Sequence, residues 1–228
     1  MSHGPACLRL NTGDGVLNRP SLGAWSLYGL GSDNRDLPGF ITLTPSIYHG
    51  GTQNFGSAFL AASFQGTSIG DGNGEFPRTA AVSNVVPGRS RSIQRRQLDL
   101  LATANREHLA QTGADARLEA RIRAFETAFR MQSSIPAVFD LSSESKETLA
   151  LYGIGGGATD EYGRECLLAR RFSERGVRFV QLFINAQIWD NHNNIGTTLR
   201  GACARTDTPN AEWPSEARAR ISEANAHE

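Results

Sequence analysis

Asp190 and His192 are the residues whose types and spacing best suit chemistry in this sequence. They stand two positions apart in the polar run WDNHNN, which follows a short apolar segment. A carboxylate and an imidazole at this spacing can bind one divalent metal, because zinc, manganese and iron accept oxygen and nitrogen ligands. Such an ion can activate a bound water or polarise a phosphoryl or sulfuryl oxygen. The alternative is a loop aspartate that caps the next helix beside a solvated histidine.

The other possible sites in the sequence are weaker. His3, in SHGPA, and His49, in YHGG, are each by themselves typical of solvated side chains, and His108 falls within an expected helix. The glycines at 155–157 lack the Lys-Ser/Thr ending of a phosphate loop.

The segment before Asp190 predicts the element that positions it. Residues 177–184, VRFVQLFI, form a nearly continuous apolar run, which is typical of a strand buried on both faces in a parallel sheet. A helix is expected just before this strand, at 159–175, with Gly176 as its C-terminal cap. In open α/β sheets, ligands bind beyond the carboxyl ends of the strands. Asp190 and His192 are therefore expected at that edge.

The remaining elements predict an α/β fold with a loop-rich N-terminal part. LPGFITLT, at 37–44, fits a short strand, and the glycine-rich stretch 49–74 is expected to be a loop. Pro136 is expected to end the helical run before it. A short helix should start at Ser142 or Ser143. The other helices expected are 19–31, 91–111 and 115–133, the last two as a helical hairpin with Arg117, Arg121, Arg123 and Glu126 facing water.

Composition excludes several classes of protein. The 228 residues carry 23 basic and 23 acidic side chains, so the charge gives no nucleic-acid footprint. Cys7, Cys166 and Cys203 are odd in number and far apart, which argues against a disulfide framework or a structural zinc site. No apolar run is long enough for a membrane span, and the N-terminus lacks a signal-peptide pattern. As written, the chain is expected in the cytoplasm.

Several stretches together resemble a known family. They are RPSLGAWSLYGLGS, LPGFITL, FETAFRMQSSIP, YGRECLLARRFSERGVRFVQLF and WDNHNN, and they cover about residues 1–209. Their order is similar to that in an uncharacterised bacterial sulfatase-like family, domain of unknown function 1501. The resemblance implies the alkaline-phosphatase-like superfamily, with a mainly parallel sheet flanked by helices. It further implies a divalent metal such as zinc, manganese or calcium, and hydrolysis of small-molecule sulfate or phosphate esters.

The resemblance also suggests roles for single residues. Asp190 and His192 match the W-D-x-H motif, which makes them expected metal ligands, and His3 is expected to line the substrate site. The family's export signal, its early Asp-bearing glycine loop and its later G-E-F-G-R-T-P segment have no counterpart here. The chain is therefore expected to be a central fragment of an exported, periplasmic parent, partial over 1–209 and with a divergent, disordered or weakly helical tail at 210–228.

Two alternatives to a hydrolase stay open. The chain could be a catalytically inactive truncated product, because two ligands do not close a metal site. It could also be a carbohydrate or surface binding module, in which Trp25, Tyr28 and Tyr48 stack on sugars.

Overall fold

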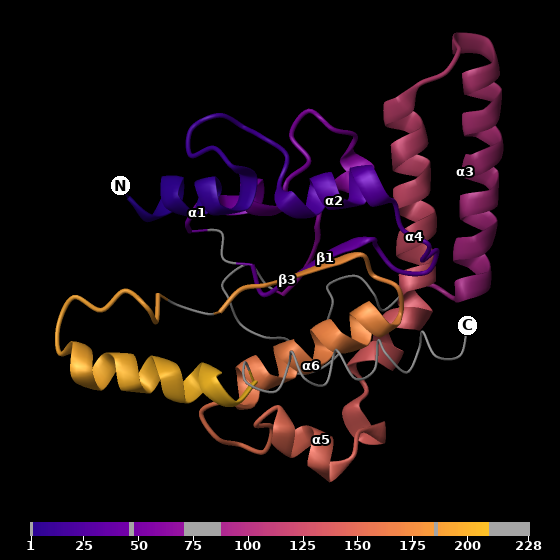
Figure 1. Ribbon diagram of the computed structural model, residues 1–228. Coiled ribbons are helices and arrows are strands. Elements are labelled where there is room, and N and C mark those ends of the chain that lie inside the picture. The colour runs from indigo at the N-terminus through magenta and orange to yellow at the C-terminus, as the bar shows by residue number, and fades with distance from the viewer. Residues whose placement is uncertain (1, 46–47, 71–87, 185–186, 210–228) are drawn as a thin grey trace.

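The protein folds around a small parallel sheet in the computed structural model, which describes residues 2–45, 48–70, 88–184 and 187–209. The described strands are β1 (Phe40–Leu43), β2 (Thr67–Ile69) and β3 (Phe179–Leu182). Their order is β2-β1-β3, and both pairings are parallel. Helices lie on both faces of the sheet (Figure 1). The expected α/β class is confirmed.

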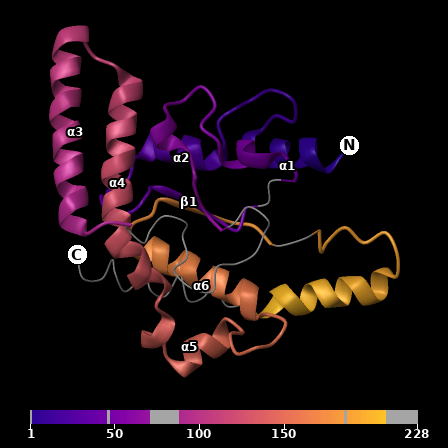
Figure 2. The same cartoon turned by 180° about the vertical axis from the view of Figure 1, so that it is seen from behind.

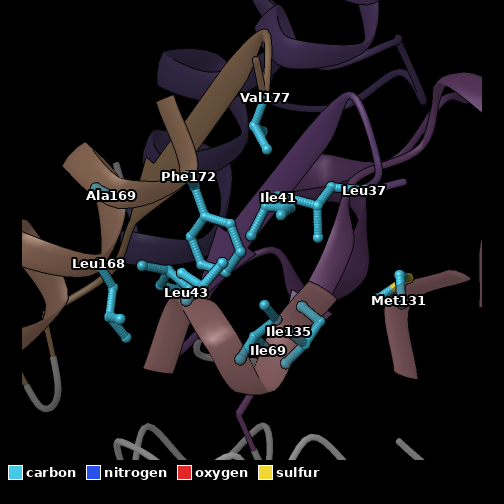
Figure 3. Close-up of a cluster of buried hydrophobic side chains, with 11 residues drawn as sticks. Leu37, Ile41, Leu43, Ile69, Met131, Ile135, Leu168, Ala169, Phe172 and Val177 are labelled. Carbon is cyan, nitrogen blue, oxygen red and sulfur yellow. The ribbon is translucent and has the colours of Figure 1, made fainter. Parts of the chain in front are cut away.

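The central strand β1 divides the core into two parts. Ile41 and Leu43 are fully buried among residues of α4 (Ala116–Phe139) and α6 (Asp160–Glu174), as Figure 3 shows. Phe40 points to the opposite face, where it packs with Leu27 and Phe55. Successive side chains of a strand point to opposite faces. The four residues of β1 therefore contribute buried side chains to both parts of the core.

The two faces of the sheet carry different helices (Figures 1 and 2). One face is covered by α1 (His3–Thr12) and α2 (Leu22–Leu30), and the other by α6, beside which lies α5 (Lys146–Leu151). Ser21 caps α2 as its sequence suggests, because its hydroxyl accepts a hydrogen bond from the Ala24 amide at 3.3 Å.

The expected helical hairpin consists of α3 (Arg91–Thr112) and α4, and it stands beside the sheet (Figure 1). Asp115 caps α4 by accepting hydrogen bonds from two backbone amides. Glu126 was expected to face water, but it pairs with both terminal nitrogens of Arg95 at 2.8 and 2.7 Å. This bidentate pair joins the two helices.

The prediction that Pro136 ends the helix is wrong, since α4 continues to Phe139. A proline inside a helix costs about 3 kcal/mol, because it lacks an N–H and crowds the preceding turn. Its neighbours Ile135 and Val138 are fully buried in the core. Burying two such side chains contributes roughly 1.5–3 kcal/mol each, which outweighs the cost of the proline.

The strand from Val177 also differs from its prediction. Among the described residues β3 pairs only with β1, and each of its four residues is half-buried rather than buried on both faces. The strand buried throughout is β1. The predicted loop at 49–74 contains η1 (Gly51–Phe55), η2 (Ala62–Phe64) and β2, which are too short to give a periodic pattern.

Two helices lacked a sequence signal strong enough to predict. One is α1, which has no fully buried residue, and the other spans residues 195–209 and buries Ala202 and Thr206. The short helix expected from Ser142 or Ser143 is present in two pieces, η3 (Leu141–Ser143) and α5, and Ser145 caps the second. The tail at 210–228 lies outside the described residues.

Two expectations from composition agree with the structure. All three cysteines are free, and Cys166, on α6, is buried in the hydrophobic core. None of the helices in the described ranges is both long and apolar enough to cross a membrane.

Candidate functional site

The predicted site residues meet at the carboxyl edge of the sheet. Asp190 lies between two imidazoles: its Oδ2 is 3.1 Å from Nε2 of His3, and its Oδ1 is 2.9 Å from Nε2 of His192. The Asp190 side chain is 27% exposed, and both histidines are more exposed than that. The cluster is therefore open to solvent, as a site for a soluble ligand must be.

The polypeptide brings these residues together in two ways. Because β1 and β3 are parallel, the segments that follow them leave the sheet at the same edge. The helix that carries His3 is held there by a chain of carboxamides. Gln181 of β3 donates to Oδ1 of Asn11 at 2.7 Å, and Asn11 donates to Oδ1 of Asn54 at 3.2 Å. These bonds fix α1 over the end of β3.

His49 joins this cluster, although the sequence did not predict it as a site residue. Its ring centroid lies 5.2 Å from that of His3, and its backbone carbonyl accepts a hydrogen bond from Asn54 at 2.6 Å. Its Nε2 is buried, and no described residue hydrogen-bonds to it. Asp190 was predicted as a site residue because ligands bind beyond the carboxyl ends of strands in open α/β sheets. The same argument could have predicted His49, since it follows β1.

Comparison with known proteins settles the family. The DUF1501 family, described as a protein of unknown function, matches residues 1–220. This chain belongs to the DUF1501 family. No curated protein and no solved structure matches it.

The cluster of this DUF1501 chain has the donor types of a metal site but not a finished set of ligands. Carboxylate oxygen and imidazole nitrogen suit divalent metals. Yet within the described ranges no three or more His, Cys, Asp and Glu side chains are grouped so that they could hold a metal ion. Both oxygens of Asp190 are already engaged by imidazoles. A metal would have to displace these contacts.

Proposed function

We propose that this chain carries a hydrolase site for sulfate or phosphate esters that depends on a divalent metal bound by Asp190 and His192, with His3 lining the substrate site. The observation that carries the proposal is the position of Asp190 within 3.1 Å of one imidazole and 2.9 Å of the other. These groups come from segments almost two hundred positions apart in the sequence. Asp190 and His192 supply two of the three protein ligands that a catalytic zinc site usually has.

Each residue of the proposed site would have its own role. The Asp190 carboxylate supplies negative charge, and the His192 imidazole supplies a neutral nitrogen ligand when deprotonated. His3 contacts Asp190 from the side of the substrate site. When bound, a divalent ion polarises an ester oxygen. His49 borders the same site, because its ring centroid lies 5.2 Å from that of His3.

Titration with metal tests this proposal. We expect the purified chain to bind one Zn²⁺ or Mn²⁺ ion per molecule in calorimetric titrations, and EDTA to remove any hydrolysis of aryl sulfates or phosphates. His192→Ala should weaken metal binding more than about 100-fold, because a ligand itself is lost. His108→Ala, on the exposed face of α3, is the matched control and should bind like the original chain. Absence of stoichiometric binding, or hydrolysis that resists EDTA, would exclude the metal mechanism.

A second candidate function, binding of a neutral carbohydrate, is favoured by an exposed aromatic surface. We define this surface by Phe59, Trp25, Tyr28 and Phe64. Successive rings in that order contact each other edge-on with centroids 5.4–5.8 Å apart. Phe59 is 64% and Tyr28 56% exposed. The sequence segments 20–32 and 37–70, in which these four residues occur, contain no Asp, Glu, Lys or Arg. Such uncharged surroundings suit an uncharged ligand that stacks on rings.

A glycan array distinguishes this candidate. We expect binding of a neutral glycan that survives EDTA, and a loss of roughly thirtyfold in the Trp25→Ala variant, the size expected for a central tryptophan contact. Trp189→Ala is the control, because Trp189 is similarly exposed but lies beside Asp190. Equal binding by both variants, or none by the original chain, would rule out the aromatic surface.

A further inference from the structure

A second buried group lies at the same edge of the sheet. Glu165, on α6, is only 2% exposed, and the Oε1 of its carboxyl group lies 2.8 Å from Oγ1 of Thr44. Its Oε2 is buried without a hydrogen-bond partner in the described ranges. The same Thr44 hydroxyl lies 2.7 Å from the carbonyl oxygen of Phe183. One hydroxyl therefore stands between a carboxyl group and a carbonyl group.

Counting protons shows which form of Glu165 fits this arrangement. Thr44 has one hydroxyl proton, and the Phe183 carbonyl can only accept a hydrogen bond. An ionised Glu165 could also only accept a hydrogen bond. The single Thr44 proton could then serve either Glu165 or Phe183, and the other close contact would have no proton between its two oxygens. A protonated Glu165 donates to Thr44, which then donates to Phe183, and both contacts are satisfied. Leaving such buried contacts unmade is costly, which favours the protonated acid.

The surroundings of Glu165 favour the same form. Burial is the largest influence and raises the pKa of Glu165 to about 8, opposed by its hydrogen bond with Thr44. Glu161, on the same helix, raises it further, and Arg205, from the helix at 195–209, lowers it. The neighbouring Cys166 is a neutral thiol, because burial raises its pKa to about 12. Glu165 is thus uncharged at neutral pH.

Thr44 connects this acid to the functional site. Thr44 directly follows β1, and its backbone amide donates to the Ile69 carbonyl of β2 at 2.8 Å. Phe183 is the first residue beyond β3, and the chain runs from it to Asp190 and His192. The backbone of Thr44 is left-handed, with φ at +48°, a conformation that a β-branched residue adopts only when its surroundings hold it.

We propose that Glu165 is a positioning residue, which in its protonated form holds the Phe183 carbonyl through the Thr44 hydroxyl and so fixes the start of the loop that carries Asp190 and His192. Its effect on hydrolysis rests on the proposed function, whereas the hydrogen-bond relay does not. Ionisation of Glu165 would turn the Thr44 proton towards the carboxylate and release the Phe183 carbonyl. The loop then loses one of its anchors.

The pH dependence of stability tests the relay. A raised pKa means that Glu165 stabilises the fold fully below pH 4.5, and that this contribution is lost as the pH rises towards 8. The folded-to-unfolded ratio should therefore fall by roughly two to three powers of ten over this range through Glu165 alone. Glu165→Gln keeps a donor for Thr44 but cannot ionise, so we expect it to lack this decrease. Glu107→Gln, exposed on α3, should retain it.

Amide NMR shifts supply a readout that stability alone does not. In the original chain, the amides of Phe183 and Asp190 should titrate with the midpoint of Glu165, and in Glu165→Gln they should not. The proposal would be overturned if stability changed with pH equally in the original chain and in Glu165→Gln. It would also be overturned if the Phe183 and Asp190 amide shifts did not change with pH, or changed in the same way in both proteins. Both readouts work on metal-free protein. A failure of metal binding would therefore contradict the proposed function and leave the relay result intact.

Discussion

We expect the Asp190→Ala variant to lose stoichiometric binding of a divalent metal while it keeps its fold. Asp190 is the residue that both His3 and His192 contact, so its removal takes away the common centre of the cluster. Loss of an outer partner of a metal ligand usually weakens metal binding 10- to 100-fold, and loss of the ligand itself should exceed about 100-fold. Calorimetric titration with Zn²⁺ or Mn²⁺ measures the change.

Two controls separate binding from folding in this experiment. Asp190→Asn keeps the shape of the side chain but removes its charge, so it too should bind metal weakly. Asp207→Ala removes an exposed carboxylate from the helix at 195–209 and should leave metal binding unchanged. Exposed ion pairs contribute about 0–1 kcal/mol, so the free energy of unfolding of Asp190→Ala should fall by no more than that. An Asp190→Ala chain that binds metal normally would refute the proposed ligand set.

The largest effect on stability is expected from Glu144→Ala. Glu144 accepts from Nη2 of Arg170 at 2.7 Å and from Nη1 of Arg171, and both arginine side chains are almost fully buried. Arg171 also donates to the carbonyl oxygens of Ala137, Val138 and Asp140, which ties α6 to the end of α4. Removing one partner of a buried ion pair leaves an uncompensated charge, so we expect the free energy of unfolding to fall by about 3–5 kcal/mol.

Urea unfolding of matched variants measures this effect. Glu107→Ala, which removes an exposed carboxylate from α3, should change the free energy of unfolding by less than about 0.5 kcal/mol. Burial alone would raise the pKa of Glu144, but Arg170 and Arg171 outweigh it and hold the pKa below its usual value. The stabilisation is therefore present above pH 4.5 and is lost as the pH falls below it. A Glu144→Ala chain as stable as the control would show that the network does not stabilise the fold.

Much of the fold could be predicted from the sequence where the signals are local. Ser21 and Asp115 mark the starts of α2 and α4 because a capping side chain acts on amides only two or three positions ahead. The apolar run from Val177 predicts β3 for a similar reason. Asp190 and His192 were predicted as site residues because they follow that strand, and membership of the DUF1501 family was confirmed by the match over residues 1–220.

Other features were decided only by tertiary structure. Parallel strands pair over long distances along the chain, and β1 is central because Ile41 and Phe40 bury opposite faces of the sheet at once. That burial also explains why α4 continues past Pro136. No local pattern could show that His49 lies beside His3, or that Glu165 reaches Thr44 across 121 positions. The sequence alone predicted two of the strands and the helices other than α1 and the one at 195–209. Packing between distant segments decided which side chains meet, because only the shared core sets their distances.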